Sequence, residues 1–426
     1  MSGASGANGP NGPGGAGGAS GASGPSGPAE AGAALGLPEL APGAPIDDDA
    51  LAAWLADIVP AAELAATPQD ASFHAEGDVW THTKLAIRAL IESPAYAAAD
   101  PAARPILAAA VLLHDIGKPS TTRLEGEKLS SRGHSARGDT LTRAALWRLG
   151  VSFTVREHVC SLIRHHQIPF YGVTREPVDA NRLAIRLSLL LRNDWLTAVA
   201  DADGRGRRCA DPADQVRIID HCALWAEHCC ELGVLDAARG FPTPHTRRVW
   251  LESAPGARDP DVPAYDDTAC EVILMSGLPA SGKDSWLRAH RPDLPVISLD
   301  RLRGELDVDP DDAQSEVIAV AREQARRYLR AGTSFAWNAT NLTPSLRGQL
   351  LELFRGYRAR THIVYCEAGP EDLLTRNRSR EARVPAWVID RMIERWTVPD
   401  PAEAHAVTYA IPSGPGAVTW PPTPQI

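Results

Sequence analysis

The sequence predicts two unlike domains, an all-α domain followed by an α/β domain built on a parallel sheet. From Ile46 to about Gly240, apolar residues recur three and four positions apart, as in "DVWTHTKLAIRALI" and "RPILAAAVLLHDIG", which is the period of packed helices. Beyond residue 268, short apolar runs such as "CEVILMS" and "THIVYCEA" alternate with helical segments, which is typical of a parallel sheet with crossover helices. The stretch 241–268 between them is rich in proline and is interpreted as a linker.

The two ends of the chain are predicted to be tails. Residues 2–28 contain only Ser, Gly, Ala, Asn and Pro, which cannot bury enough apolar surface to offset the entropy of ordering. We therefore expect a disordered tail over 1–45, a helical domain over 46–240, an α/β domain over 269–412 and a second tail over 413–426.

Composition limits the classes of function. The formal net charge of -10 argues against indiscriminate binding to nucleic acid, so any such contact should be confined to a local site. The seven cysteines have no regular spacing, and the sequence shows no secretory leader and no apolar run of the roughly 20 residues that cross a bilayer. These features predict a cytoplasmic protein without a membrane role.

The segment "VLLHDIGKPSTT" ends an apolar stripe in two ionisable residues, His114 and Asp115. Because burial of unpaired charge is costly, these side chains need a partner, and a metal ion would be one. A helix-end ion pair is the plain structural alternative. Gly117 is suited to end this helix with a left-handed residue.

Further candidate ligands lie in the other helical segments of the same domain. They are His82 in "VWTHT", His134 in "RGHSARG", the pair His165 and His166 in "IRHHQ", and Asp201 in "AVADADGRG". Mixed imidazole and carboxylate ligands suit transition metals, including a pair of ions bridged by a carboxylate. Such a centre activates water for attack on phosphorus, and Lys118 would place a compact cation beside the phosphate.

This region resembles the HD superfamily of metal-dependent phosphohydrolases. The ordered set of His82, the His114 and Asp115 doublet, and Asp201 is similar to the H…HD…D signature of that superfamily. The segments "HDIGKPSTT", "GHSARG" and "ADADGRG" resemble HD domains attached to some tRNA nucleotidyltransferases. The resemblance implies that these four residues are ligands of a divalent metal of the Mn, Ni, Co or Zn class. His134 and His166 would complete a two-metal version, and His165 could exchange roles with His166.

Other histidines and cysteines of this domain are given structural roles. We assign His74 and His158 to local hydrogen bonding. A cluster of six further residues lacks the paired C-x-x-C spacing of structural zinc and is interpreted as buried, weakly polar helix surface. Its members are Cys209, His221, Cys222, His228, Cys229 and Cys230.

The α/β domain opens with "VILMSGLPASGKDSW", which satisfies G-x-x-x-x-G-K directly after a strand and before a helix. In this context backbone N–H groups cradle nucleotide phosphates, and the lysine reaches the terminal ones. The predicted nucleotide-binding residues are Gly277, Leu278, Pro279, Ala280, Ser281, Gly282, Lys283, Asp284 and Ser285. Asp284 stands where a magnesium-binding Ser or Thr is expected, and Ser285 could substitute as a ligand of Mg²⁺.

Acceptor-side residues follow the next predicted strand. Asp300 in "VISLDRLR" ends that strand at the edge where an acceptor would lie, and its carboxylate could accept the proton of an attacking hydroxyl. Arg376 and Arg380 lie four positions apart on one helical face and could stabilise a transferring phosphoryl group. A solvated arginine face is the alternative.

The α/β domain resembles the polynucleotide 5′-kinase branch of P-loop phosphotransferases. The resemblance implies that Asp300 is the general base, that Arg303 and Arg347 contact the acceptor, and that Arg376 and Arg380 form a lid. Asn338 departs from it, because it replaces the Asp of a "DATN"-like strand end.

Together the halves resemble bacterial bifunctional RNA end-healing enzymes of the HD-Pnk type. The resemblance implies removal of a 2′-phosphate or 2′,3′-cyclic phosphate at one end, and phosphorylation of the 5′-hydroxyl at the other with Mg²⁺ and ATP or another NTP. The substrate would be broken RNA, with DNA as a possibility, and a separate RNA ligase would seal the ends. Two alternatives are an HD nucleotidase joined to a small-molecule or nucleoside kinase, and a non-enzymatic RNA-binding protein with a relic HD domain.

Overall fold

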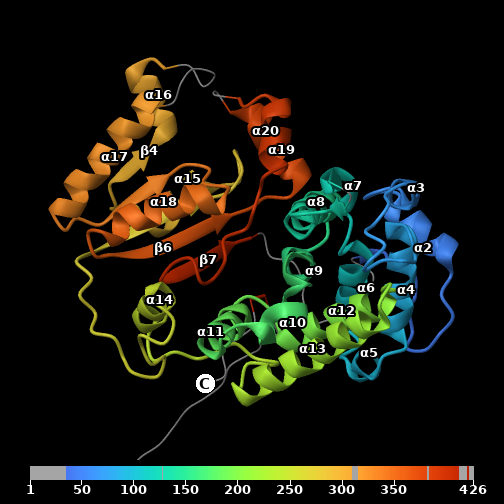
Figure 1. The fold of residues 1–426 in the computed structure, drawn as a ribbon. Helices are drawn as coiled ribbons and strands as arrows, with labels where there is room; N and C mark the ends of the chain where they lie inside the picture. Colours follow the sequence, from blue (N-terminus) through green and yellow to red (C-terminus); the bar gives the residue numbers. More distant parts are fainter. Residues whose placement is uncertain (1–34, 127, 309–314, 381–382, 412–419, 422–426) are drawn as a thin grey trace, which may run out of the picture.

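A computed structural model describes residues 35–126, 128–308, 315–380, 383–411 and 420–421. It confirms the predicted fold class, because a helical domain is followed by an α/β domain with a five-stranded parallel sheet. Figure 1 shows the two domains side by side, with the sheet on the left and the helices on the right. No helix in the described part of the chain is both long and apolar enough to cross a bilayer.

The helical domain is organised around four helices that contact one another, α4, α6, α9 and α12. Their buried side chains form a single large core, which explains the three-and-four spacing of apolar residues in the sequence. The helices of this domain are α2 (Asp48–Leu55), α3 (Ala61–Ala65), α4 (Val79–Ile91), α5 (Pro94–Ala98), α6 (Arg104–Leu113), α7 (Lys118–Thr121), α8 (His134–Arg148), α9 (Phe153–His165), α10 (Ile168–Tyr171), α11 (Pro177–Ser188), α12 (Asn193–Gly206) and α13 (Pro212–Glu231). A short 3-10 turn, η1 (Gly172–Thr174), follows α10.

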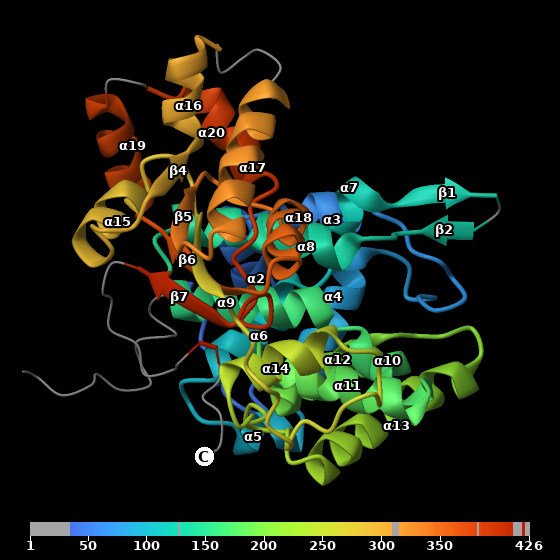
Figure 2. The same cartoon turned by 90° about the vertical axis from the view of Figure 1, so that its left-hand side faces the viewer.

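A two-stranded antiparallel hairpin interrupts the helices. Its strands are β1 (Arg123–Glu125) and β2 (Lys128–Ser130), and it projects from the body of the helical domain beside α7 (Figure 2). The helical period of the sequence did not indicate these strands, because they are short and exposed.

The sheet of the second domain has the order β4-β5-β3-β6-β7, and each pair of neighbours is parallel. Because all strands point the same way, the loops after them meet at one edge of the sheet. The strands are β3 (Cys270–Ser276), β4 (Val296–Ser298), β5 (Phe335–Asn338), β6 (Ala359–Cys366) and β7 (Ala406–Ala410). The helices are α15 (Lys283–His290), α16 (Leu299–Leu306), α17 (Ser315–Arg330), α18 (Pro344–Arg355), α19 (Pro370–Ser379) and α20 (Ala386–Ile393).

Two segments predicted to be irregular are more ordered than composition indicated. Of the expected tail over 1–45, residues 1–34 lie outside the described residues, whereas residues 35–45 pack on the helical domain. There Trp54 Nε1 donates to Leu35 O at 2.8 Å, and the Tyr96 hydroxyl donates to Leu40 O at 2.8 Å. Within the expected tail over 413–426, Trp420 is buried against Phe153. These contacts with residues distant in the sequence, rather than any local period, order the segments.

The expected linker 241–268 contains helix α14 (Pro244–Glu252), which bridges the two domains. Arg248 donates to the carbonyls of Ala402 and Glu403 in the α/β domain. On the other side, Arg182 of α11 donates to the carbonyl of Leu251. Proline content did not reveal this helix, which uses Pro244 in its first turn.

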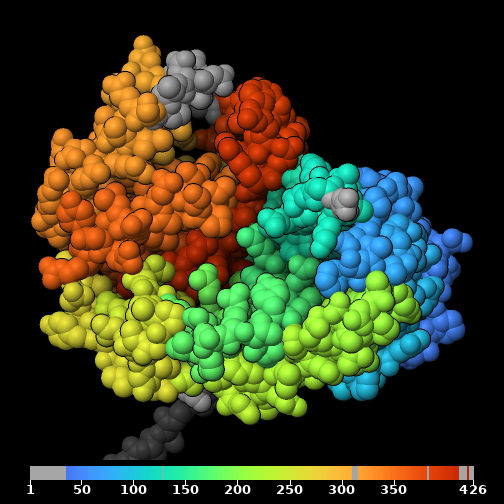
Figure 3. Space-filling model, in the orientation of Figure 1, coloured from blue at the N-terminus to red at the C-terminus, as the bar shows by residue number. Residues whose placement is uncertain are grey.

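The domains also share a hydrophobic core on the side of helices α8 and α9. The cluster joins residues of the helical domain to the loop after β3, to the end of β6 and to helices α19 and α20. Its principal members are Ala144, Trp147, Phe153, Leu278, Tyr365, Ala368, Leu373, Ile389, Ile393 and Trp396. The close packing of the two lobes is visible in the space-filling view (Figure 3).

Candidate metal centre and phosphate-binding loop

Four segments of the helical domain bring five ionisable side chains to one buried place. His82 comes from α4, and His114 and Asp115 follow α6. His134 begins α8, and His166 caps α9. The structure therefore brings together five of the six predicted metal ligands, and each of them is at most 6% exposed.

Asp201 is the exception, and the prediction for this residue is corrected. Its carboxylate pairs with Arg205 at 2.7 Å on the outer face of α12. Asp203 takes the expected place, because its Oδ1 lies 3.0 Å from His82 Nε2 and its Oδ2 lies 3.9 Å from His166 Nε2. Helix period explains the difference, since two positions along a helix turn a side chain by about 200°.

The ligand atoms lie close enough to share ions. Four overlapping groups in the described part of the chain have ligand atoms within 4.8 Å of one another, and three of them consist of these cluster residues and share members, as expected for two neighbouring metal ions. The three groups are His82, His114 and Asp115; His114, His166 and Asp203; and Asp115, His134 and His166. Asp115 joins two of them, with Oδ2 at 3.2 Å from His114 Nε2 and Oδ1 at 3.4 Å from His134 Nε2.

Three of the histidines are oriented by their own main chain. In each, Nδ1 faces the carbonyl oxygen three residues earlier, at 2.6 Å for His114, 2.9 Å for His134 and 2.7 Å for His166. A neutral ring that donates from Nδ1 keeps a lone pair on Nε2, and Nε2 is the atom that faces the cluster. Neither buried oxygen of Asp115 has a well-directed hydrogen bond. The free Nε2 atoms of these histidines and the carboxylate oxygens of Asp115 are ligand atoms that fit a divalent metal.

The charges around the cluster keep both aspartates ionised. Burial raises the pKa of Asp115, but the adjacent His114 and the Lys118 ammonium outweigh burial and hold the pKa well below its usual range. Burial likewise opposes ionisation of Asp203, and the Arg207 guanidinium outweighs it, with two contacts of 3.0 Å. Burial lowers the pKa of His166 to about 3, so this ring is neutral and able to ligate.

Lys118 lies at the cluster as the sequence predicted. Its Nζ is 2.6 Å from Asp115 Oδ2 and donates to Gln69 Oε1 at 2.5 Å, and the side chain is buried. The ammonium therefore adds positive charge directly beside the carboxylate shared by two ligand groups.

Gly117 is required for a reason other than the expected left-handed helix end. Its φ is -77°, which is ordinary helical backbone. A Cβ on this residue would lie 2.1 Å from the carbonyl oxygen of His134, closer than any real contact. The glycine therefore lets the turn after α6 touch the start of α8, which brings Asp115 and His134 together.

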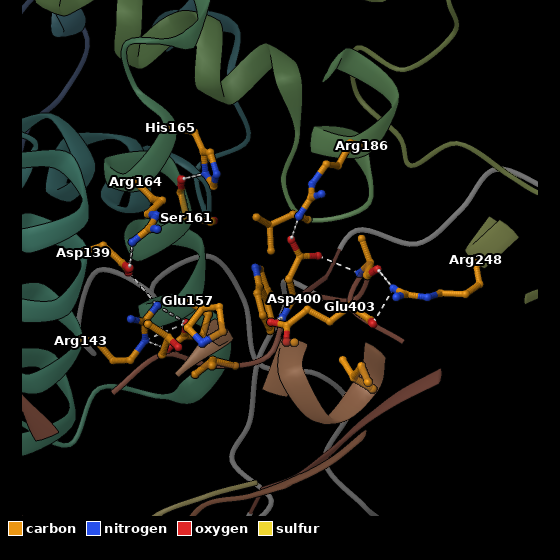
Figure 4. A pocket seen from close by; sticks show the side chains of 18 of the residues that line it. Asp139, Arg143, Glu157, Ser161, Arg164, His165, Arg186, Arg248, Asp400 and Glu403 are labelled. Atoms are coloured by element: carbon orange, nitrogen blue, oxygen red, sulfur yellow. Dashed lines mark hydrogen bonds and ion pairs between the residues drawn. The ribbon is translucent and has the colours of Figure 1, made fainter. Parts of the chain in front are cut away.

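His165 points away from the cluster. Its Nδ1 donates to Ser161 O at 2.9 Å, and the ring lines a cavity of about 520 Å³ between the two domains. Figure 4 shows His165 beside Arg164 on one wall and Glu403 on the other. Of the two candidates, only His166 belongs to the cluster.

The cysteine-rich set forms no metal group among the described residues. All six of its members are described, and none belongs to a cluster of possible ligands. Cys222 and Cys229 are buried free thiols, and burial raises the pKa of Cys229 to about 12. His74, in contrast, lies next to the centre, with Nδ1 at 2.8 Å from Glu76 Oε1.

The predicted phosphate-binding loop connects β3 to α15. Gly277 has φ +137° and Gly282 has φ +103°, conformations that favour glycine. A Cβ on Gly277 would lie 2.2 Å from Cys366 O, so the loop passes directly over the end of β6. Lys283 folds back and donates to the carbonyls of Gly277 and Leu278 at 3.0 and 2.8 Å, and burial lowers its pKa to about 8.

The two departures from the kinase pattern contact each other. Asn338 Nδ2 donates to Asp284 Oδ1 at 2.6 Å, so the amide from the end of β5 holds the carboxylate at the start of α15. An Asp in place of Asn338 would oppose Asp284 with like charge, so the swaps are complementary. Ser285 accepts from Arg288 at 3.2 Å on the exposed helix surface, whereas Asp284 is the residue held beside the β5 end.

Acceptor-side and lid residues meet at the same edge. Asp300 forms an ion pair with Arg303, and its Oδ2 lies 3.7 Å from Arg380 Nη2. Arg376 approaches the loop, since a Cβ on Gly282 would lie 3.8 Å from its Nη1. The Asp300 side chain is 71% exposed, which leaves the acceptor edge open.

Arg347 does not reach this edge, which corrects its predicted role as a substrate contact. Its side chain is fully buried and makes two contacts to Glu403, at 2.6 and 2.7 Å, and further bonds to the carbonyls of Asn341 and Thr397. All of its donor directions are used inside the domain, so Arg347 fixes the start of α18 against the segment before β7.

Comparison with known proteins agrees with this architecture. Residues 83–220 match the HD domain model, and residues 272–399 match an AAA domain model. Similar solved structures include a putative kinase from Chloroflexus aurantiacus, at 19% identity and a TM-score of 0.29, which covers 34% of this chain and 86% of that chain. A sugar kinase from a Janibacter species, at 14% identity and a TM-score of 0.27, covers 33% of this chain and 85% of that chain. The chain thus joins a helical region that matches the HD domain model to an α/β region that matches the AAA domain model.

Proposed function

We propose that the protein heals broken RNA ends. The helical domain would remove a 2′-phosphate or a 2′,3′-cyclic phosphate, and the α/β domain would phosphorylate a 5′-hydroxyl with an NTP. The observation that carries the proposal is the presence, in one chain, of a buried histidine and aspartate cluster and a separate P-loop with an open acceptor edge.

In the hydrolytic half, each residue has a defined task. His82, His114, Asp115, His134, His166 and Asp203 would hold divalent metal of the Mn, Ni, Co or Zn class. Bound metal supplies a water of lowered pKa and neutralises charge on phosphorus. Lys118 orients Asp115 and presents a cation to the phosphate, and Arg207 keeps Asp203 ionised.

In the kinase half, the main task of the protein would be to place charged side chains around the nucleotide phosphates and the transferred group. Lys283 would leave its two carbonyl partners and contact the terminal phosphates, with Asp284 and Asn338 placed for Mg²⁺. Asp300 would accept the proton of the attacking hydroxyl. Arg376 and Arg380 would neutralise the charge that develops on the transferred group.

The open acceptor edge favours a polynucleotide over an enclosed metabolite. Asp300 lies in the first turn of α16, just after β4, with most of its side chain in solvent, so an RNA end could approach without being enclosed. Trp387 of the neighbouring helix α20 is 55% exposed, with the Arg391 guanidinium 5.8 Å from its ring centre. An exposed aromatic ring of this kind can stack on a nucleobase.

An RNA with a 5′-hydroxyl and a 2′,3′-cyclic phosphate end tests the proposal directly. The protein would be incubated with this RNA, an NTP, and Mg²⁺ with Mn²⁺, and each terminus would be analysed separately. Asp115→Ala should lower phosphate removal at least about 100-fold and leave 5′-phosphorylation intact, because it removes the shared carboxylate. Lys283→Ala should have the converse effect, with a loss of about 100- to 1,000-fold.

The two variants serve as controls for each other. Loss of both activities in either variant would contradict independent sites. Wild-type turnover of a free nucleoside, without turnover of the RNA, would favour the alternative of a nucleotidase joined to a small-molecule kinase.

A further inference from the structure

His82 differs from the other three histidines of the cluster in how its ring is held. His114, His134 and His166 each face a main-chain carbonyl through Nδ1. The Nδ1 of His82 instead lies 2.9 Å from Oε1 of a side chain, Glu76. A substitution cannot remove a main-chain carbonyl, but it can remove the carboxylate of Glu76. The orientation of the His82 ring therefore depends on one side chain.

Glu76 is fixed in place from three directions. Its Oε1 also accepts from His74 Nδ1 at 2.8 Å, and its Oε2 accepts from the backbone N–H of Arg208 at 2.8 Å. The backbone beside it is tied to the same segment, because Ala75 N donates to Arg208 O at 2.7 Å. Only 2% of the Glu76 side chain is exposed, so water cannot easily replace these partners.

The contact between His82 and Glu76 is short but is not well directed for a hydrogen bond. Although Glu76 is 2.9 Å away, Nδ1 of His82 has no well-directed hydrogen bond, while its Nε2 lies 3.0 Å from Asp203 Oδ1 and 3.3 Å from His114 Nε2. A small rotation of the ring would align the N–H of Nδ1 with Glu76 and keep the Nε2 lone pair on the cluster.

We propose that Glu76 is a positioning residue that keeps the proton of His82 on Nδ1 and aims Nε2 into the metal centre. A carboxylate that accepts from the far nitrogen of a ligating histidine fixes the tautomer and raises the basicity of the ligand. His74 supports this task because it donates to the same oxygen at 2.8 Å, and the rings of His74 and His82 meet edge to face with centroids 4.7 Å apart.

This inference rests on the metal centre of the proposed function, but its test requires no RNA. The full chain, stripped of metal, would be titrated with Mn²⁺, and with Co²⁺ to record the ligand-field spectrum. Glu76→Ala should weaken metal binding about 10- to 100-fold and change the Co²⁺ spectrum. Glu76→Gln keeps an acceptor oxygen for His82 and should recover most of the affinity.

Asp78→Ala is the matched control, because it removes the N-cap of the same helix α4 without touching His82 Nδ1. It should keep the wild-type affinity and spectrum. Wild-type metal binding by Glu76→Ala, or an equal loss in Asp78→Ala, would overturn the positioning role. A loss of one bound ion in both Glu76 variants would also overturn it, since Glu76 would then be a ligand of an additional ion with His74 and His82.

Metal titration separates failure of this inference from failure of the proposed function. If the variants behave as expected but the wild type does not act on RNA ends, Glu76 positions a metal ligand of an enzyme with another substrate. If RNA ends are processed and Glu76→Ala binds metal normally, only the positioning role is lost.

Discussion

Lys283 is the single residue whose protonation should control nucleotide binding. Burial lowers its pKa to about 8, and its ammonium donates to the carbonyl oxygens of Gly277 and Leu278. Phosphate groups favour the charged form, so the pKa of Lys283 should rise when a nucleotide binds. Above a pH of about 8 the free protein therefore has to take up a proton on binding.

We predict that NTP affinity is nearly constant below a pH of about 8 and falls by up to about tenfold for each further pH unit. Calorimetric titration across this range measures the affinity and the proton uptake. Lys283→Arg provides the control, because its guanidinium does not titrate there. Equal pH dependence in both proteins would assign the titration to another group.

For single residues, the sequence identified which types of side chain form the site better than it identified which positions carry them. The histidines and the His114 and Asp115 doublet were predictable, since they interrupt apolar stripes. The choice between Asp201 and Asp203 needed the period of α12, in which Leu196, Val199 and Ala200 place Asp203 on the buried face. Arg347 could not be assigned from sequence, because its partner Glu403 lies 56 positions away.

Among the elements, the turn between α6 and α7, which packs against the start of α8, tolerates a larger side chain least. Gly117 lies where a Cβ would meet the His134 carbonyl at 2.1 Å and the Gly138 nitrogen at 2.8 Å. Both neighbours are backbone, so α8 would have to move away. This movement would separate His134 from Asp115.

Gly117→Ala should therefore destabilise the protein by about 1–3 kcal/mol and weaken metal binding. Gly348→Ala is the matched control, because its Cβ meets nothing within 4 Å in helix α18. It should stabilise the protein by up to about 1 kcal/mol through helix propensity. Urea unfolding monitored by circular dichroism measures both, and a neutral effect of Gly117→Ala would show that α8 adjusts freely.

Element types were predictable wherever periodicity was strong. The helices around the cluster and the strands around the P-loop follow patterns that report burial on one face or both. Helix α14 and residues 35–45 were missed, because their order comes from a few long-range hydrogen bonds to the rest of the protein. Such contacts leave no local pattern in the sequence.

On the scale of the whole molecule, the two sites are built on one interface. Helices α8 and α9 carry His134 and His166 at their ends on one side. On the other side α9 carries Arg156, which makes bidentate contacts with Glu367 at 2.9 and 2.7 Å. Glu367 directly follows β6, over whose end the phosphate-binding loop passes. No local pattern in the sequence indicated this interface.

Removal of Glu367 should therefore destabilise the whole chain. In Glu367→Ala the buried Arg156 guanidinium loses its bidentate partner, at an expected cost of about 3–5 kcal/mol. Asp390→Ala breaks an exposed interdomain pair with Arg148, at 3.5 Å, and should cost at most about 1 kcal/mol. Calorimetric unfolding compares the two, and a similar small loss in both would show that the buried pair is not a principal support of the interface.

The central claim is that the buried histidines and aspartates, with Asp203 rather than Asp201, form a metal centre. Mn²⁺ titration of the metal-free full chain and of the isosteric variants Asp203→Asn and Asp201→Asn tests it most directly. The account predicts wild-type affinity for Asp201→Asn and a loss of at least about tenfold for Asp203→Asn, with nucleotide binding unchanged in both. Unaltered Mn²⁺ binding by Asp203→Asn, or an equal loss in Asp201→Asn, would contradict it.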